Sequence, residues 1–313
     1  MSKRKIRFKK QESWAGYLFV LPNLIGFLVF TSLPVVAAIG LTLFHWDLLT
    51  PPSFVGFRNV VDLLGFHRLD GVWVANDSQF WKYLYNTIFM MLIIPVNIFG
   101  SLLLASMMIQ NIRGVIVLRT IFFLPTISAG VAVCFLWQWL YNTDVGLINV
   151  AIERAGDFLG LPLKGIPWLT STTWAKPALM LMTFWMAVGG TNMILYMAAL
   201  TNVPRQLYEA AEIDGANGWQ KFWSVTWPMI SPTTFFICIM SVIGGFQGGF
   251  LQAYTMTQGG PAGATTTLEL YIYRTAYESF EMGYAATIAC VLFVMVLFMT
   301  LLNWKYGGKH VTY

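Results

Sequence analysis

Six long apolar runs alternate with polar segments along the chain. A helix needs about 20 mostly apolar residues to cross a bilayer. We therefore expect six membrane-spanning helices, at residues 15–44, 85–109, 116–140, 177–202, 232–252 and 284–303. Strands of a membrane barrel are short and alternate polar with apolar residues, unlike these runs. The predicted fold class is an all-α integral membrane protein, a six-span helical bundle.

Composition agrees with this pattern. Hydrophobic residues make up 57% of the 313 residues and charged residues 11%, against about 45–50% and about 25% in soluble domains. The first apolar run is about twice the 7–15 residues of a signal-peptide core, so we interpret it as a retained span. The three cysteines, Cys134, Cys238 and Cys290, each lie inside an apolar run and form no motif.

The distribution of basic residues predicts the orientation. Lys and Arg near span ends favour the cytoplasmic side. With the N-terminus in the cytoplasm, 12 of the 19 basic residues lie on that side, and six of them fall in the first ten residues. We expect both termini to be cytoplasmic, with the loops 45–84, 141–176 and 253–283 facing outward. This clustering does not indicate nucleic acid as a partner.

The six predicted spans contain no Asp or Glu. Ion-coupled carriers usually need a carboxylate inside the membrane, which makes that class of transporter the weaker alternative. The sequence has no Walker A motif, and His45, His67 and His310 are scattered, so it indicates neither a metal site nor a catalytic dyad. If the chain belongs to a pump, the energy comes from another subunit.

A dense polar segment, "EAAEIDGANGWQKFW" (209–223), separates the fourth and fifth spans. Pro204 suits the first turn of a helix, which we expect to run to about Ile213. Asp214 and Gly215 then predict a turn, with a second helix from near Asn217. That helix would place Trp219, Phe222, Trp223 and Thr226 on one face. A plain amphipathic connector and a surface for a partner protein are both open interpretations.

The stretch from Glu209 to Pro232 closely resembles the EAA signature of permease subunits in bacterial binding-protein-dependent ABC importers. The matching positions are Glu209, Ala210, Ala211, Asp214, Gly215, Ala216, Phe222, Pro228 and Pro232. Four other segments resemble the sugar and glycerol-3-phosphate branch of that family, in order: "FVGFRNV" (54–60), "LRTIFFLP" (118–125), "YNTDVGLINV" (141–150) and "TQGGPAGATTTLELYIYRTAY" (257–277).

The resemblance implies a transport subunit of the bacterial inner membrane that is not itself an enzyme. It implies a basic segment at 1–14, a permease domain at 15–303 with the EAA loop at 203–231, and a tail at 304–313. Expected partners are a second homologous permease, a dimer of ATPase subunits, an external solute-binding protein and membrane lipids. ATP and Mg²⁺ would bind the ATPase, and this chain would hold no cofactor. Glu209, Ala210, Ala211, Asp214, Gly215 and Ala216 would couple it to the ATPase.

The solute implied by the resemblance is a sugar or oligosaccharide, with glycerol-3-phosphate as the alternative. A phosphate would favour Arg or Lys in the pathway, and none is apparent. The fifth span contains "IGGFQGGF" (243–250), whose two GxxxG pairs also fit tight helix packing. By the resemblance, the substrate path would include Phe246, Gln247, Gly249, Trp185, Thr191, Asn192, Thr126 and Ser128.

Overall fold

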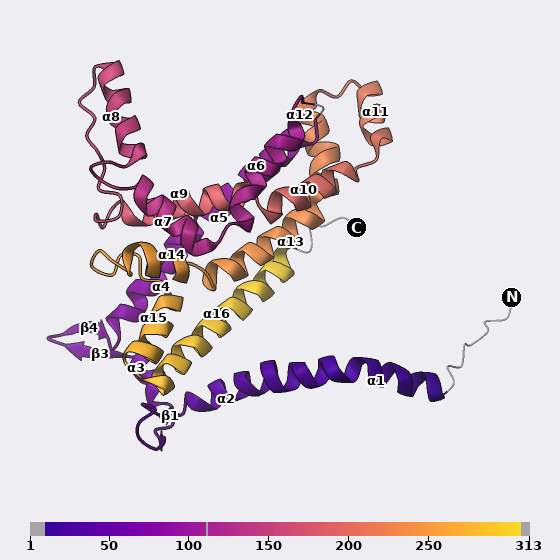
Figure 1. Cartoon of the computed structure of the whole chain (residues 1–313). Helices are drawn as coiled ribbons and strands as arrows, with labels where there is room; N and C mark the ends of the chain where they lie inside the picture. The colour runs from indigo at the N-terminus through magenta and orange to yellow at the C-terminus, as the bar shows by residue number, and fades with distance from the viewer. Residues whose placement is uncertain (1–9, 111, 308–313) are drawn as a thin grey trace.

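The computed structural model describes residues 10–110 and 112–307, so the predicted basic segment 1–14 and tail 304–313 lie partly outside the described residues, as does His310. Figure 1 shows the arrangement of the elements. In chain order they are α1 (Lys10–Phe27), α2 (Leu33–Leu41), β1 (Phe44–His45), β2 (Ser53–Phe54), α3 (Arg58–Leu64), β3 (Phe66–Leu69), β4 (Val72–Ala75), α4 (Ser78–Met91), α5 (Ile93–Met108), α6 (Val115–Ile127), α7 (Gly130–Leu140), α8 (Leu147–Leu159), α9 (Ala175–Val188), α10 (Thr191–Thr201), α11 (Arg205–Ile213), α12 (Gly218–Lys221), α13 (Trp227–Phe246), α14 (Phe250–Gln252), α15 (Leu268–Tyr273) and α16 (Met282–Gly307).

Short π-helical turns extend or join several of these helices. They lie at Leu28–Ser32, Phe222–Thr226, Ala253–Thr257 and Arg274–Glu278. Five continuous helical segments are long and apolar enough to cross a membrane: Gly16–Leu41, Ser78–Met108, Ala175–Thr201, Gly218–Thr257 and Met282–Lys305. The bent pair α6–α7 makes a sixth if it is counted as one span. The described chain is therefore a helical membrane bundle, as predicted.

The third span differs from its predicted form. We expected one helix over 116–140, and the structure has two helices that meet at 102°. Pro125 cannot donate the backbone hydrogen bond that a helix interior needs, and Ser128 and Ala129 are extended. The Ser128 hydroxyl donates to the carbonyl oxygen of Leu124 at 3.0 Å. The chain therefore leaves the helix at Ser128 and starts a new one at Gly130.

The fifth span also starts earlier than expected, because α12, a π-helical turn and α13 form one continuous helical segment from Gly218. Pro228 is the second residue of α13 and follows the π-helical turn Phe222–Thr226 closely, so the missing N–H of Pro228 coincides with a local change in the helical hydrogen-bond pattern. The second helix of the polar segment is thus the beginning of the fifth span itself.

Three clusters of buried side chains hold the bundle together. One joins α5, α10 and the start of α13 around Met193, Tyr196 and Ile230. A second joins α7 and α9 and includes Trp168. A third joins α3, α4, α15 and α16 around Phe80 and Ile288. Each cluster links helices that are distant in sequence, so the spans from α4 onward form one packed body.

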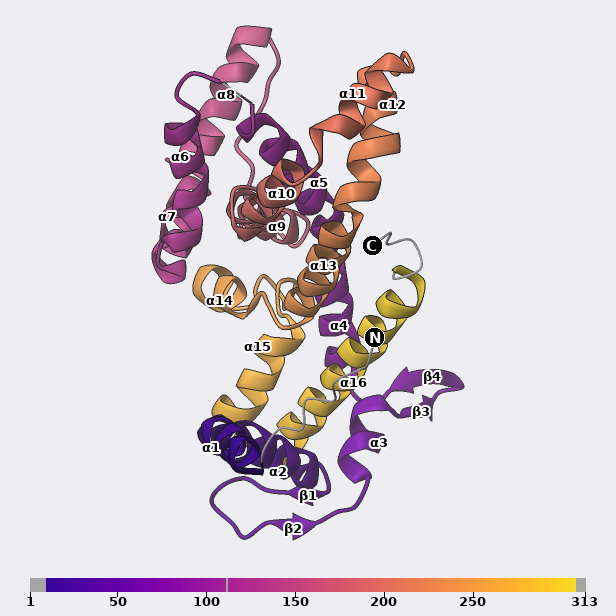
Figure 2. The same cartoon turned by 90° about the vertical axis from the view of Figure 1, so that its right-hand side faces the viewer.

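The first span lies apart from that body. None of the 18-residue window that marks Gly16–Leu41 as a candidate span is buried, and α2 is the part of this span that packs against α16. Figure 2 shows α1 and α2 at the edge of the bundle. The surface of this helix is apolar all round, which suits contact with lipid or with another membrane helix.

The two ends of the molecule carry different elements. Helices α11 and α12 lie at one end, whereas α8 and the hairpin β3–β4 lie at the other (Figure 1). Both two-stranded pairs, β1–β2 and β3–β4, are antiparallel, and apart from Phe44 at the start of β1 they fall within the predicted loop 45–84. The start of α1 and the end of α16 point toward the α11–α12 end.

Candidate functional site

Interruptions of the third, fourth and fifth spans lie against one another inside the bundle. A methyl group on Gly189, between α9 and α10, would collide with the carbonyl oxygen of Phe122 on α6. One on Gly190 would lie 3.0 Å from the Thr126 hydroxyl, and one on Gly130 would lie 2.6 Å from Leu251. At Gly189 the neighbouring atom is backbone, so a side chain there would require the two segments to move apart. Interrupted helices at membrane depth are typical of transport sites, because they present free backbone and side-chain polar groups.

A cavity of about 270 Å³ lies next to these interruptions. We call it the central cavity. Its lining comes from the middle of the second and fourth spans and from the end of α13. The lining residues are Thr87, Met90, Met91, Ile93, Ile94, Asn97, Met180, Thr183, Ala187, Asn192, Ser241, Gly244, Gly245, Gly248, Gly249, Gln252 and Thr267. None of these described residues carries a charge.

Several polar side chains of the central cavity have no hydrogen-bond partner. Asn97 is 7% exposed, and its buried Oδ1 atom accepts no hydrogen bond from the described residues. Within the same described part of the chain, the side chains of Asn192, Ser241 and Gln252 make none either. Thr87 and Thr183, by contrast, donate to backbone carbonyls of their own helices. The cavity therefore offers the amides of Asn192 and Gln252 and the hydroxyl of Ser241 to a ligand, whereas the Oδ1 atom of Asn97 is enclosed by the protein.

The residues predicted for the substrate path are only partly brought together. Asn192 and Gly249 line the central cavity. Thr126 and Ser128 lie at the α6–α7 bend, and Thr191 is an exposed neighbour of Asn192. Trp185 is 43% exposed and packs edge-on against Trp137, with ring centroids 5.6 Å apart.

Phe246 and Gln247 are placed differently. Phe246 is buried in the cluster with Leu268 and Ile288, away from the cavity lining. Gln247 is an exposed residue just after α13. The sequence reasoning did not single out Asn97, Ser241 or Gln252. A lone amide in the apolar run "IIPVNIFGSLL" is the one signal that pointed to Asn97.

Residues 203–231 form an elbow between the fourth and fifth spans. Helix α11 ends at Ile213, and Gly215 takes a positive φ of 76° with no atom near the position of a Cβ. Asn217 then caps α12 in a reciprocal pair with Gln220. The Tyr208 hydroxyl is 2.8 Å from that of Thr226, which ties α11 to the start of the fifth span. The helix–turn–helix expected from the sequence is present.

The elbow exposes most of the residues predicted to couple to a partner. Glu209, Ala210, Asp214 and Gly215 are exposed, whereas Ala211 and Ala216 are half-buried, Ala211 against the cluster that joins α5, α10 and α13. Glu209 forms an exposed ion pair with Arg205, at 3.2 Å. Two large apolar side chains also face solvent, Ile213 at 87% and Trp219 at 71% exposed. Such a surface, with mixed polar and apolar groups, is typical of a protein–protein contact.

A second ion pair stabilises the fold of the elbow. Lys221 Nζ lies 2.8 Å from Glu212 Oε1 and bridges α12 to α11. The hydrogen bond and the charge of Lys221 hold the pKa of the Glu212 carboxyl below its usual value.

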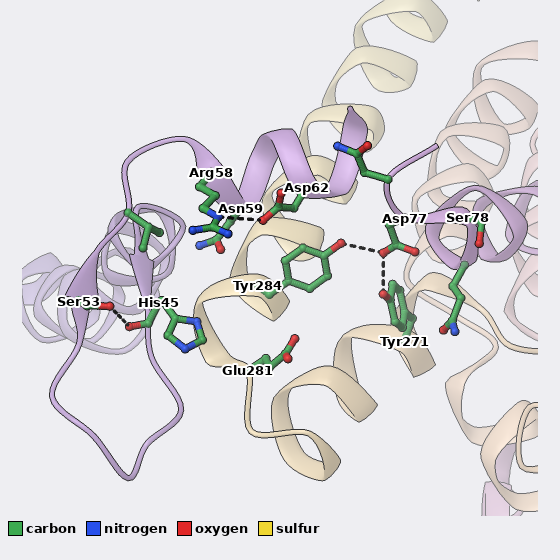
Figure 3. A pocket seen from close by; sticks show the side chains of 13 residues that line it. His45, Ser53, Arg58, Asn59, Asp62, Asp77, Ser78, Tyr271, Glu281 and Tyr284 are labelled. Carbon is green, nitrogen blue, oxygen red and sulfur yellow. Dashed lines mark hydrogen bonds and ion pairs between the residues drawn. The ribbon is translucent and has the colours of Figure 1, made fainter. Parts of the chain in front are cut away.

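At the other end of the molecule, a polar cavity of about 840 Å³ lies beside α3 (Figure 3). Asp77 organises it. One carboxylate oxygen caps α4 by accepting from the Phe80 N–H at 2.9 Å, and the other accepts from the hydroxyls of Tyr271 at 2.7 Å and Tyr284 at 2.8 Å. Burial, together with the nearby Asp77 carboxylate, raises the pKa of Tyr271, which stays a donor.

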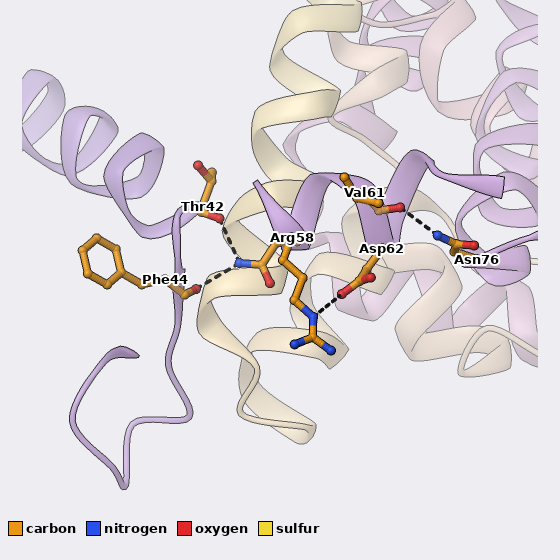
Figure 4. A network of polar contacts seen from close by, with 7 residues as sticks. Thr42, Phe44, Arg58, Val61, Asp62 and Asn76 are labelled. Atoms are coloured by element: carbon orange, nitrogen blue, oxygen red, sulfur yellow. Dashed lines mark hydrogen bonds and ion pairs between the residues drawn. The ribbon is translucent and has the colours of Figure 1, made fainter. Parts of the chain in front are cut away.

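Helix α3 is held on both sides by asparagines (Figure 4). The Asn59 amide donates to the carbonyl oxygens of Thr42 at 2.8 Å and Phe44 at 3.0 Å. The Asn76 amide donates to the carbonyl oxygen of Val61 at 3.0 Å. Arg58 and Asp62 form an exposed ion pair at 3.7 Å. These polar groups connect α3 to neighbouring segments and stabilise the fold.

Comparison with known proteins decides the family. A family model described as "binding-protein-dependent transport system inner membrane component" matches residues 17–305. The chain belongs to this family. It is therefore a membrane permease component of an ABC transporter, as the sequence resemblance suggested.

Individual relatives cover almost the whole chain. The lactose transport system permease protein LacF of Rhizobium radiobacter is 36% identical and covers 92% of each chain. The probable ABC transporter permease protein YesP of Bacillus subtilis (strain 168) is 33% identical, covering 99% of this chain and 96% of its own. A solved bacterial ABC transporter for import of the acidic polysaccharide alginate shares the fold, with a TM-score of 0.78, 24% identity and 96% coverage of both chains.

Proposed function

We propose that this permease component moves an uncharged carbohydrate inward across the bacterial inner membrane. The observation that carries the proposal is the central cavity, whose free polar side chains are amides and a hydroxyl without any charge. Amides bind sugar hydroxyls as both donors and acceptors. The name of the relative LacF, a lactose transport permease, supports the same class of solute. A glycerol phosphate would need a cationic side chain that this lining lacks.

ATP hydrolysis would take place on a separate pair of ATPase subunits that dock at the elbow. The exposed apolar side chains of Ile213 and Trp219, with Glu209 beside them, form the proposed contact. Closing of the ATPase pair would move α11 and, through α12, the fifth span that starts there. Gly248 and Gly249, just after α13, line the central cavity. Movement of this span would therefore change how accessible the cavity is from the two sides of the membrane.

The complete importer would contain a second permease of the same family and an external solute-binding protein. A structure similar in fold was solved in complex with an alginate pentasaccharide-bound periplasmic protein. In the proposed orientation, the elbow and both termini face the cytoplasm, and α8 and the hairpin β3–β4 face outward. The exposed first span would pack against the second permease or lipid.

Purification and vesicle transport test this proposal. The tagged chain, isolated from its native membrane, should carry an ATPase subunit with it, and the complex in vesicles should take up a neutral sugar only with ATP. Uptake by the chain alone, driven by an ion gradient, would overturn the proposal in favour of a secondary carrier. Uptake of glycerol-3-phosphate in place of neutral sugars would establish the alternative solute.

One variant tests the elbow. Gly215→Asp fits the open space around Gly215, at a modest cost for positive φ, so the chain should insert normally but lose ATPase co-purification and most transport. Gly160→Asp is the matched control, since Gly160 also has a positive φ, 67°, and open surroundings but follows α8 at the other end. Normal transport by inserted Gly215→Asp would rule out this docking site.

A further inference from the structure

The hairpin β3–β4 has little protein cover on either of its faces. All residues of β3 are exposed, and those of β4 are exposed or half-buried. Large apolar side chains lie open along it, including Phe66 at 52%, Val72 at 65% and Trp73 at 70% exposed. An isolated two-stranded hairpin is at best marginally stable in water. Exposed apolar surface of this kind indicates contact with a partner or a membrane.

The chain holds the base of the hairpin firmly and shapes its tip as a tight turn. At the base, the Asn76 N–H donates to the carbonyl oxygen of Gly65 at 2.9 Å, and His67 Nδ1 lies 2.8 Å from Asn76 Oδ1. At the tip, Asp70 and Gly71 both have a positive φ, 48° and 83°, as the favoured two-residue hairpin turn requires. The two faces of the hairpin therefore have fixed directions.

Strand pairing divides the side chains of the hairpin between these two faces. Directly opposed residues of an antiparallel pair point to the same side, and so do alternate residues of one strand. Phe66 pairs with Ala75, and Arg68 pairs with Trp73. One face therefore carries Phe66, Arg68, Trp73 and Ala75, and the other carries His67, Leu69, Val72 and Val74. We call the first of them the aromatic face.

The aromatic face is continuous with an exposed apolar row on the second span. The Phe66 ring packs on the ring of Trp81, with centroids 5.7 Å apart. Trp81 lies in the first turn of α4 and begins a row of exposed, mostly apolar side chains at helical spacing. The row consists of Trp81, Tyr85, Ile88, Leu92, Val96, Phe99, Leu103 and Met107. Such a row is how a membrane-spanning helix faces lipid.

The location of the hairpin places the aromatic face near the membrane surface. Strand β4 ends at Ala75, three residues before the second span begins at Ser78. Figure 2 shows the hairpin projecting past α3 and α16, on the opposite side of the bundle from α6 and α7. Tryptophan is enriched at the level of the lipid headgroups, which suits Trp73.

The charge on the aromatic face also suits lipid headgroups. Arg68 Nε donates to the carbonyl oxygen of Gly71 at 3.4 Å, and the two terminal amino groups of its guanidinium have no partner among the described residues. Arginine binds phosphate oxygens with two parallel hydrogen bonds. Its aliphatic part can lie along apolar surface while the charged group reaches the headgroups.

We propose that the aromatic face of β3–β4 lies on the phospholipid surface of the membrane. The rings of Phe66 and Trp73 contact the boundary between headgroups and acyl chains, and the Arg68 guanidinium contacts a lipid phosphate. The hairpin then extends the lipid contact of the second span beyond the span itself. The inference goes beyond the proposed function and depends neither on the solute nor on the orientation, because a bilayer has headgroups on both sides.

Two adjacent residues on opposite faces give a matched pair for the test. Trp73→Cys and Val72→Cys are each made in the full chain, labelled in detergent with a small thiol-reactive fluorophore and reconstituted into phospholipid vesicles. The native Cys134, Cys238 and Cys290 lie in α7, α13 and α16, and the chain without an added cysteine measures background labelling. Phosphatidylcholine with a nitroxide near its headgroup should quench the probe at position 73 several-fold more than that at 72. Aqueous iodide should quench the two probes in the reverse order.

A second pair of variants tests the contact between the hairpin and the second span. With the probe at position 73, Phe66→Ser removes the ring that packs on Trp81 and should lower lipid quenching several-fold. Leu69→Ser, on the other face, should leave the quenching unchanged. Equal lipid quenching at positions 72 and 73 would overturn the inference. Quenching at 73 by iodide alone would also overturn it, because the aromatic face would then lie in water, open to a soluble protein. Both results would leave the proposed function untouched.

Discussion

Two asparagines on the second span make opposite use of the same side chain. Asn86 on α4 and Asn97 on α5 are eleven residues apart, about three helical turns, so they lie on the same side of the span. Both are buried, at 1% and 7% exposed. Asn86 donates to the carbonyl oxygens of Gly263 at 2.9 Å and Thr266 at 3.0 Å and accepts from Lys176 at 3.0 Å. Asn97 accepts no bond at Oδ1 from the described residues.

The contrast extends to the regions around them. Toward the α8 end, the buried Asn59 and Asn149 and the half-buried Asp77 have their partners within the protein, although the indole Nε1 of Trp137 has none among the described residues. Around the central cavity, Asn97, Asn192, Ser241 and Gln252 have none among the described residues. We infer that the paired polar groups in the first region stabilise the fold, whereas Asn192, Ser241 and Gln252 are free to contact the proposed solute. Burial alone does not distinguish Asn86 from Asn97, but hydrogen-bond pairing does.

The largest expected effect comes from removing the paired asparagine. Asn86→Leu leaves two carbonyl oxygens without donors and the Lys176 ammonium without its acceptor, although the rings of Tyr85 and Phe89 still face that ammonium at 4.7 and 4.9 Å. We expect a loss of about 3–5 kcal/mol in unfolding free energy. Thermal unfolding of the purified protein measures it.

The control for this change is the same substitution at the unpaired position. Asn97→Leu should leave stability unchanged or raise it by about 1 kcal/mol, because an orphaned polar atom is removed. Equal losses at both positions would contradict the division into paired polar groups that stabilise the fold and unpaired ones that do not.

The next effect concerns Asp77, the acceptor that joins three elements. Asp77→Ala removes the cap of α4 and leaves the hydroxyls of Tyr271 and Tyr284 without their acceptor. A lost cap costs about 1 kcal/mol, and the unpaired hydroxyls add to it, so we expect about 2–3 kcal/mol of destabilisation. Asp77→Asn keeps an oxygen for the cap and should lose about half as much. Sugar carried per ATP by the surviving complexes should stay at the wild-type value.

Two glycine-to-alanine substitutions compare a packed position with a position in the central cavity, and they change side-chain size instead of polarity. Gly189→Ala would force a methyl group against the backbone of Phe122, and such overpacking costs about 1–3 kcal/mol. Gly244→Ala meets no atom within 4 Å and should be neutral or gain up to about 1 kcal/mol from helix propensity. Since Gly244 lines the central cavity, its variant should fold well and transport less. Wild-type transport by Gly244→Ala would show that the cavity is not on the pathway.

Sequence reasoning predicted those features that depend on local chemistry. The turn at Gly215 and the helix start at Asn217 follow from the residues at those positions, and the spans follow from run length. The bend at Ser128–Ala129 was missed, because one Pro and a few small residues barely change the polarity of an apolar run. The two asparagines of the second span look alike in sequence, since pairing depends on Gly263, Thr266 and Lys176, which are distant along the chain. For the same reason, sequence could not show that Phe246 packs into the core.

The smallest effect is expected where a paired polar group lies at the surface. Lys221 lowers the pKa of Glu212 from its ordinary value of 4.5. The ion pair therefore stabilises the elbow above that ordinary value, and its contribution is lost as pH falls through the lowered pKa. Glu212→Gln should unfold at a slightly lower temperature than the wild type at pH 7, and the difference should vanish once the pH has fallen below the lowered pKa of Glu212. Because exposed pairs are screened by water and salt, 1 M NaCl should reduce the difference at pH 7. A loss of stability as large as that of Asn86→Leu would mean that pairing stabilises the protein equally at the surface and in the interior. The difference between Asn86 and Asn97 could then not be attributed to burial.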